Sequence, residues 1–380
     1  MNIYWITKLS DKNPFRSTQL GASEGLRKRG HKVTLFFIRN FNDKKSNTDE
    51  INYIPIIDKP LFSGLVFGLI LFFYFPFLSK KNKVDMVIID GDQIFSPFII
   101  MMKLMHIPIV WDIRSLPIDC DKSLLHDISF YLTNYLANAL TTITPELKNF
   151  LQKTYNLYDK KIGLWPSGVS MQTFSVDNTP LKSPNTVKKN KFTLIHHGTY
   201  SPTRGIEELI QSIQQIPNSI RNDIQLLLVG IPKEKIQDLY ALAKQLNVEK
   251  QITIILPVKL KEIPAYIQSA DVGVIPLPPE NKWWKVSVPL KTLEYLAMAK
   301  PIIVTDIPFH RKIIQECKCG RITQTGNPED IAKEITYLYE HQNELAIMGE
   351  KGQRLIENKY TWENIACYLE TFINEILEHK

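Results

Sequence analysis

Cysteine is rare in this chain, and its arrangement excludes two kinds of site. The four cysteines (Cys120, Cys317, Cys319 and Cys367) have neither the spacing of a zinc site nor that of a disulfide framework, which is typical of a protein in a reducing compartment. The sequence also lacks internal repeats and low-complexity tracts. Its basic residues are dispersed, so no nucleic-acid-binding module is indicated and we expect no nucleic-acid partner.

The N-terminal residues lack the features of a secretory signal. MNIYWITKLSDKNPF has neither a basic start nor a long apolar stretch, and we expect it to form a strand followed by a loop. Together with the cysteine usage, this favours a cytoplasmic protein. The formal net charge of +7 suits anionic partners such as phosphates or an acidic membrane face.

The length of 380 residues exceeds what one hydrophobic core usually supports, so two domains are expected. Nearly continuous apolar strands alternate with helices over residues 1–176 and again over 192–358. This pattern predicts two doubly wound domains, each built on a parallel sheet covered on both faces. The polar, proline-bearing residues 177–191 are the expected linker. Residues 359–380 are expected to form a C-terminal helix, which could pack back on the first domain.

One segment differs from the rest of the chain. Residues 61–78, LFSGLVFGLILFFYFPFL, carry no charge and are followed by SKKNK. The length is at the lower limit for a spanning helix, and a buried strand, VDMVIID, resumes directly afterwards. Two readings remain open, a very apolar core helix or a helix or hairpin in the plane of the membrane interface. The density of phenylalanine favours a membrane surface contacted through residues 61–83, with lysines against lipid phosphates.

The second domain opens on a strand and a helix with features of an anion site. HHGTYSPTRGIEELI places Gly198 at a strand end and Arg204 just before a helix, whose first amides attract negative charge. An arginine there suits phosphate oxygens, although a solvated loop arginine is the plainer alternative. The His196–His197 pair could bind a metal, but no third ligand is nearby in the sequence.

A second helix start carries a cation and a carboxylate one turn apart. In VPLKTLEYLAMAKPIIVTD, Pro289 is expected at the first helical position, with Ser287 at the cap and the amide of Leu290 free. Lys291 and Glu294 share a face, which suits a phosphate beside a ribose. The alternative is a surface salt bridge. The flanking apolar strand favours a buried site.

These motifs resemble those of a known family. The two Rossmann-like domains, the GxxxxxRG that opens the second, and VPLKTLEYLAMAKPIIVTD are similar to the retaining glycosyltransferases of family 4, with the GT-B architecture. ALTTITPELKNFL and KIGLWPSGV support the resemblance in the first domain. The resemblance implies two α/β domains that face a cleft, and a nucleotide-diphosphate sugar as co-substrate with no cofactor.

The resemblance also implies roles for individual residues. Glu294 would be the second glutamate of the family's E-x7-E motif and would hold the nucleotide ribose. Arg204 and Lys291 would hold the diphosphate and stabilise the leaving group. Amides around Ser287, Pro289 and Leu290 would surround the transferred sugar, and Gly198 belongs to the same donor-binding set.

The sequence departs from the family pattern at several places. The first glutamate of E-x7-E falls at Val286, and Glu280, Lys285 or Ser287 are the nearby candidates to replace it. The loop after the first strand, SDKNPFRSTQ, has no glycine. These departures keep open a catalytically silent binding subunit, and the shared architecture keeps open a sugar-nucleotide 2-epimerase.

The first domain supplies weaker candidates. Asp112 ends a buried strand in VWDIRSLP, and in similar enzymes this position is near the donor sugar and acceptor, so we expect a catalytic role. Asp112 could instead cap the following turn or pair with Arg114. Arg16 and Arg114 are candidates for binding an acceptor.

The resulting prediction is a retaining, metal-independent transferase. It would move a hexose or N-acetylhexosamine from a nucleotide-diphosphate sugar to a hydroxyl of a lipid-linked or polysaccharide acceptor, at the cytoplasmic face of the membrane. No metal-binding D-x-D motif is expected at the donor site, so cations and helix amides would neutralise the leaving diphosphate.

Overall fold

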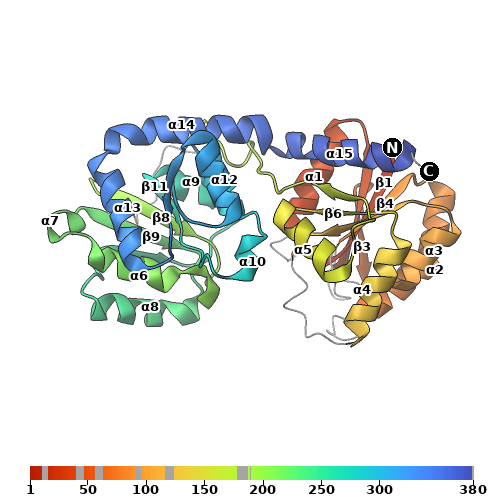
Figure 1. Ribbon diagram of the computed structural model, residues 1–380, viewed down its shortest axis with the longest axis horizontal. Coiled ribbons are helices and arrows are strands. Elements are labelled where there is room, and N and C mark those ends of the chain that lie inside the picture. The colour runs from red at the N-terminus through yellow and green to blue at the C-terminus, as the bar shows by residue number, and fades with distance from the viewer. Residues whose placement is uncertain are drawn as a thin grey trace. The chain divides into compact units, whose positions relative to one another are not determined.

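The computed structural model describes residues 1–10, 16–39, 47–55, 63–90, 96–115, 124–177, 187–188 and 190–378. The chain divides into two compact units, Met1–Gly168 with Trp362–Lys380, and Val169–Thr361. Figure 1 shows that each unit has a sheet with helices packed against it. Most of the predicted linker, residues 177–191, lies outside the described residues.

The first unit is built on a parallel sheet in the order β3-β2-β1-β4-β5-β6-β7. The strand order reverses between β1 and β4, as in a doubly wound fold. Its strands are β1 (Asn2–Ser10), β2 (Lys32–Arg39), β3 (Ile51–Pro55), β4 (Met86–Asp90), β5 (Ile109–Ile113), β6 (Ala139–Thr142) and β7 (Ile162–Leu164). Its helices are α1 (Ser17–Lys28), α2 (Ser63–Lys81), α3 (Ser96–Leu104), α4 (Leu124–Leu136), α5 (Pro145–Tyr155) and α15 (Trp362–Glu378).

The C-terminal helix α15 belongs to the first unit because glycines on α1 admit it closely. A methyl group at Gly21 would lie 2.3 Å from the ring of Trp362, and one at Gly25 would lie 2.5 Å from the Trp362 carbonyl oxygen. Glu370 adds an ion pair with His31, at 2.6 Å. Helix α15 therefore packs on helix α1.

Helix α2 contains most of the apolar segment. It runs without a break through Pro76, so the segment is one helix within the described residues. Phe67, Leu71 and Phe75, each four residues apart, are fully buried. The opposite side exposes 69% of Phe73 and 71% of Phe77. Within the described part of the chain, no helix has the length and apolarity needed to cross a bilayer.

The second unit repeats the layered plan with a parallel sheet in the order β10-β9-β8-β11-β12-β13. Helices α6, α8 and α13 enclose the main apolar core against this sheet. Its strands are β8 (Phe192–His197), β9 (Ile224–Val229), β10 (Ile252–Ile255), β11 (Val272–Ile275), β12 (Ile302–Thr305) and β13 (Gly320–Thr323). Its helices are η4 (Pro202–Arg204), α6 (Ile206–Gln215), α7 (Asn218–Arg221), α8 (Lys233–Gln245), η5 (Leu260–Glu262), α9 (Ile263–Gln268), α10 (Lys282–Lys285), α11 (Leu290–Ala297), α12 (Pro308–Cys317), α13 (Pro328–Glu340) and α14 (Gln342–Lys359).

The predicted fold class, two α/β units with parallel sheets, is confirmed. Strands that are buried along their whole length, such as β4, β5 and β9, produced the continuous apolar runs in the sequence. Several elements were not identified from the sequence, among them strands β3, β7 and β13 and helices α5 and α12. These three strands lie at the edges of their sheets. Edge strands are less buried and give a weaker apolar pattern.

Candidate functional site

Gly198 and Lys291 come together at the carboxyl end of strand β8. Gly198 follows β8 with φ 121°, a conformation that favours glycine. A methyl group at Gly198 would lie 2.7 Å from Cε and 2.9 Å from Nζ of Lys291. The lysine ammonium group therefore packs over the glycine backbone. This places a cation of α11 at the end of β8.

Arg204 ends the turn η4, two residues before helix α6 begins. Its guanidinium group lies 5.6 Å from the ring centroid of Trp284, a residue of α10. The Trp284 indole N–H also donates to the carbonyl oxygen of Thr203, at 2.8 Å. Gly205 then turns the chain with φ 69°, where a methyl group would lie 1.9 Å from the carbonyl oxygen of Pro276. Trp284 thus contacts both the backbone of the η4 turn and the guanidinium group of Arg204.

The two cations, Arg204 and Lys291, repel each other. Burial, then repulsion by Arg204, lowers the pKa of Lys291 to about 7, and Glu294 only partly opposes this. Burial also lowers the pKa of Arg204. Among the residues that the structure describes, no carboxylate forms a salt bridge with either side chain. Two unpaired, partly buried cations favour the binding of an anion.

The start of α11 adds backbone donors to the same place. Pro289 is the N-cap and the helix begins at Leu290, so the predicted position of Pro289 inside the helix was wrong. The reason is its ψ of 114°, which is extended and suits a cap. The first intrahelical bond runs from the Thr292 N–H to the Pro289 oxygen, at 3.1 Å. The preceding amides, of Leu290 and Lys291, are those left free by helix geometry.

Glu294 is one turn further along α11 and contacts a histidine. Its Oε2 lies 3.0 Å from Nε2 of His197, and the two side chains are only 14% and 9% exposed. The neighbouring His196 is fully buried, and its Nδ1 contacts the carbonyl oxygen of Val274 at 3.0 Å. Burial, then the charge of Lys291, lowers the pKa of His196 well below its usual value, so this ring is neutral.

Ser287, which was also predicted to bind the donor sugar, forms a hydrogen bond within the protein. Its hydroxyl donates to the carbonyl oxygen of Trp284, at 3.1 Å. Val286, at the position of the missing first glutamate, is 8% exposed. No group of three metal-ligating side chains is present among the described residues, so the His196–His197 pair has no third ligand there.

Asp112 and Arg114 lie in the first unit and form a buried network. Asp112 Oδ1 accepts from Thr141 at 2.7 Å and from the indole of Trp165 at 3.0 Å. Its Oδ2 lies 3.5 Å from Nη1 of Arg114, whose guanidinium group stacks 4.0 Å above the ring of Trp165. The sequence left open that Asp112 caps the following turn or pairs with Arg114, and the structure shows the pair with Arg114. A catalytic role of Asp112 and an acceptor role of Arg114 remain predictions.

Asp90 extends this network and was not predicted. It is the register partner of Asp112 on the neighbouring strand, and it accepts from the side chains of Gln19 at 2.5 Å and Trp5 at 3.3 Å. Burial raises the pKa of Asp90 to about 7. Its place at the end of a buried strand, like that of Asp112, was the available signal. Arg16 is the N-cap residue of helix α1 but its side chain makes no capping hydrogen bond, and its role stays a prediction.

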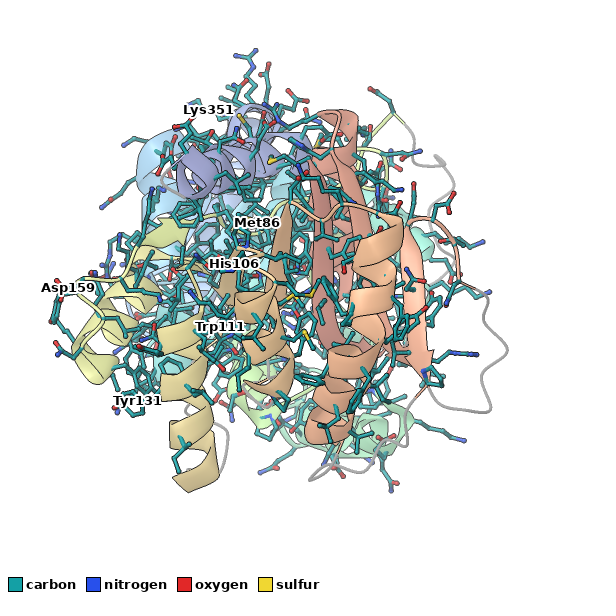
Figure 2. All side chains as sticks on the ribbon, turned by 90° about the vertical axis from the view of Figure 1, so that its right-hand side faces the viewer. Met86, His106, Trp111, Tyr131, Asp159 and Lys351 are labelled. Atoms are coloured by element: carbon teal, nitrogen blue, oxygen red, sulfur yellow. The ribbon has the colours of Figure 1, made fainter. Side chains whose placement is uncertain are left out.

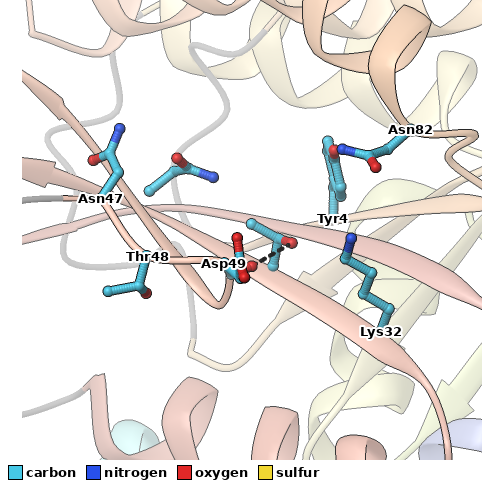
Figure 3. Close-up of a pocket in the computed structure, with 8 residues that line it drawn as sticks. Tyr4, Lys32, Asn47, Thr48, Asp49 and Asn82 are labelled. Atoms are coloured by element: carbon cyan, nitrogen blue, oxygen red, sulfur yellow. Dashed lines mark hydrogen bonds between the residues drawn. The ribbon is translucent and has the colours of Figure 1, made fainter.

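A polar hollow of about 490 Å³ opens elsewhere in the first unit (Figure 3). Its lining includes Tyr4, Lys32, Asp49 and Asn82. The Thr34 hydroxyl donates to the Asp49 carbonyl oxygen across its floor, at 3.3 Å. None of the predicted site residues lines it, so we do not connect it with the chemistry of the second unit.

Two family models match the chain. Residues 177–361 match glycosyl transferases group 1, and residues 20–173 match glycosyltransferase family 4. The chain is a family 4 glycosyltransferase. The group 1 match contains Gly198, Arg204, Lys291 and Glu294, which are residues of the predicted donor site.

Two of the relatives of this glycosyltransferase carry names of different enzymes. It is 21% identical over 70% of its length to the capsular polysaccharide biosynthesis glycosyltransferase CapM of Staphylococcus aureus, of which 71% is covered. It is 22% identical over 60% of its length to the N-acetyl-alpha-D-glucosaminyl L-malate synthase of Bacillus anthracis, of which 54% is covered. The matched region thus spans between about half and seven tenths of these relatives.

Solved structures share the fold of the transferase over its whole length. A glycosyltransferase from Rickettsia africae has a TM-score of 0.79 at 15% identity, covering 100% of this chain and 99% of the other. HepE from Anabaena, solved in complex with UDP, has a TM-score of 0.71 at 12% identity, covering 99% and 100%. These likenesses establish the GT-B fold.

Proposed function

We propose that this glycosyltransferase uses a nucleotide-diphosphate sugar as donor and holds it at the start of helix α11. The supporting observation is the pair of unpaired cations, Arg204 and Lys291, beside the free amides of Leu290 and Lys291. A pyrophosphate matches this charge and these donors. Glu294, one turn further along, accepts hydrogen bonds from the ribose hydroxyls.

The same groups assist the reaction. When the bond to the sugar breaks, negative charge grows on the leaving nucleoside diphosphate. Arg204, Lys291 and the helix amides stabilise that charge without a metal ion, because they are already oriented toward it. We propose that the sugar is transferred with retention of configuration by attack on the same face, so that the protein needs no dedicated nucleophile.

The acceptor is proposed to be a hydroxyl of a lipid-linked or polysaccharide substrate at the membrane surface. CapM acts in capsular polysaccharide biosynthesis, and another relative is a lipopolysaccharide 1,2-N-acetylglucosaminetransferase of Salmonella typhimurium, at 23% identity over 54% of each chain. A polymer or lipid-bound sugar as acceptor is consistent with both names. Asp112, Arg114 and Arg16 of the first unit are the proposed acceptor-side residues.

The first unit has a surface suited to a membrane interface. Helices α2, α3 and α4 lie side by side on one face of its sheet, and Figure 2 views this face, with Tyr131 on α4. Large apolar side chains are exposed on all three: Val66, Leu69, Phe73, Tyr74, Phe77, Ile100, Leu104, Ile128, Tyr131 and Tyr135. Lys83 and Lys103 are exposed near the ends of α2 and α3. Aromatic side chains flanked by lysines are suited to lipid headgroups.

The test of the donor site is a screen of nucleotide sugars for release of nucleoside diphosphate, followed by variants. Arg204→Ala and Lys291→Ala should each reduce turnover by about a hundredfold or more. Arg311→Ala is the matched control, because it removes a half-exposed cation of the same unit that pairs with Asp306. Wild-type turnover in both site variants would refute the proposal.

Two other outcomes of the screen would replace the transferase reaction. An epimerised nucleotide sugar, formed from donor alone, would identify a 2-epimerase. Nucleotide binding without transfer to any lipid or polysaccharide extract would identify a silent binding subunit, which Val286 at the glutamate position would explain.

The membrane surface is tested by flotation with anionic liposomes. We expect Phe73→Ser combined with Phe77→Ser to reduce flotation strongly, since these are the most exposed of the large apolar side chains described on α2. Leu260→Ser combined with Ile347→Ser is the control, because it removes exposed apolar side chains of the second unit. Equal flotation of the wild type and the α2 variant would refute the membrane proposal.

A further inference from the structure

His197 contacts two consecutive residues of helix α11. Its Nε2 lies 3.0 Å from Oε2 of Glu294. Its backbone N–H donates to the hydroxyl of Tyr295 at 3.0 Å, and the two rings meet edge to face with centroids 5.1 Å apart. The Tyr295 hydroxyl in turn donates to the carbonyl oxygen of Ile195, at 3.2 Å. The end of β8 and the first turns of α11 are therefore joined through His197.

Tyr295 fixes the distance between the two elements. It is fully buried, and a methyl group at Gly273 of the neighbouring strand would lie 2.3 Å from its ring. The tyrosine therefore has little freedom to shift. Because Tyr295 holds helix α11 in place, the direction in which the Glu294 carboxylate points is set by the contacts of the Glu294 side chain.

The Glu294 carboxylate contacts the imidazole ring of His197. A carboxylate oxygen 3.0 Å from Nε2 is repelled by a lone pair and attracted by an N–H, so the contact favours the tautomer with hydrogen on Nε2. The angles at this contact are not those of an aligned hydrogen bond. Contacts in binding sites are often misaligned before a ligand binds and become shorter and straighter with it.

We propose that His197 is a positioning residue that orients Glu294 toward the ribose and so sets the preference of the site for ribonucleotides over 2′-deoxyribonucleotides. The inference rests on the proposed donor site. With one carboxylate oxygen held by His197, the other is directed at the two vicinal hydroxyls. Without His197, the carboxylate turns toward solvent or toward Lys291. Removal of one ribose hydroxyl then reduces the affinity for the nucleotide by a smaller factor.

The test compares the affinities of UDP, ADP and GDP with those of their 2′-deoxy counterparts by isothermal titration calorimetry. For the wild type we expect the tightest ribonucleotide to bind about tenfold to a hundredfold better than its deoxy form, the range for a hydrogen bond to a charged group. His197→Leu removes the donor and keeps the bulk, and should reduce that ratio at least fivefold. His197→Gln places an amide N–H near the position of Nε2 and should preserve the ratio.

Inorganic pyrophosphate separates positioning from general damage, because in the proposed site it binds through Arg204, Lys291 and the helix amides and makes no contact that requires Glu294. We expect the pyrophosphate affinity of His197→Leu to stay within about twofold of the wild type. An unchanged ribose preference in His197→Leu would overturn the inference. So would a fall in pyrophosphate affinity as large as the fall in ribonucleotide affinity, since that would indicate a merely structural role.

Glu294→Gln distinguishes failure of this inference from failure of the donor site. If Glu294→Gln abolishes the ribose preference and His197→Leu in that background changes nothing further, the two residues act together as proposed. If Glu294→Gln retains the full preference, or none of the three nucleotides binds, the proposed donor site is wrong, and the role of His197 fails with it.

Discussion

Lys291 should take up a proton when a nucleoside diphosphate binds. Burial and the charge of Arg204 hold its pKa at about 7 in the protein without a bound anion. A pyrophosphate placed against the ammonium group favours the charged form, so the pKa rises on binding. Among the described residues, the charges of Arg204 and Glu294 act on Lys291, and Lys291 itself acts on His196, whose pKa is too low for it to contribute near neutral pH.

The size of the effect follows from the pKa of Lys291. With a value of about 7, roughly half of the molecules carry the proton at pH 7, about a tenth at pH 8, and about nine tenths at pH 6. Uptake should therefore be about 0.5 proton per site at pH 7 and about 0.9 at pH 8, falling to about 0.1 at pH 6. A terminal phosphate is largely ionised from pH 7 upward, so it adds little in that range.

The assay is calorimetric titration of the nucleotide in buffers with different ionisation enthalpies, where the slope of the observed enthalpy gives the protons exchanged. Lys291→Arg is the control, because arginine is always charged and should bind the nucleotide without proton uptake. Uptake below about 0.2 proton at pH 8 in the wild type, with binding retained, would refute the reasoning. Equal uptake in Lys291→Arg would assign the proton to another group.

Three further predictions follow from the packing. Trp284→Phe keeps a ring beside Arg204 but loses the N–H bond to Thr203, and should lower kcat/KM several-fold, whereas Trp284→Ala should approach the loss in Arg204→Ala. Asp90→Asn should be increasingly more stable than the wild type as pH rises. Burial places the pKa of Asp90 at about 7 in the folded protein, above the ordinary value of 3.8, so the wild type loses stability between about pH 4 and pH 7, by roughly 4 kcal/mol in urea unfolding. A pH-independent difference between the two proteins would contradict this. Gly25→Ala should destabilise the first unit by about 1–3 kcal/mol in thermal unfolding, because the added methyl meets a backbone oxygen of Trp362, while Glu24→Ala on the exposed side of α1 should change little.

The positions of the core strands along the chain were readable from the sequence. Strands buried on both faces must be apolar at every position, so β4, β5, β9 and β12 stood out as runs between helices. The pairing of Lys291 with Glu294 on one face of α11 was also local, because three residues make about one helical turn. Gly198 and Arg204 followed from a strand end that precedes a helix.

The apolar segment shows where a local pattern stops being informative. Helix α2 is apolar around its whole circumference, so its sequence has no period that marks an inward side. The fold buries Phe67, Leu71 and Phe75 and leaves Phe73 and Phe77 exposed. That choice depends on the neighbouring α3 and the sheet, which the segment itself does not encode.

The partners of the site residues were decided by the tertiary structure alone. Trp284 supports a turn 81 residues away, and His197 contacts Tyr295 at a separation of 98 residues. Periodicity specifies which side of a strand or helix is buried, but it contains no information about which strand end meets which helix. The sequence therefore determined two layered domains and a cationic helix start in the second. The tertiary structure brings the end of strand β8 next to helix α11, and only this arrangement places His197 in contact with Glu294.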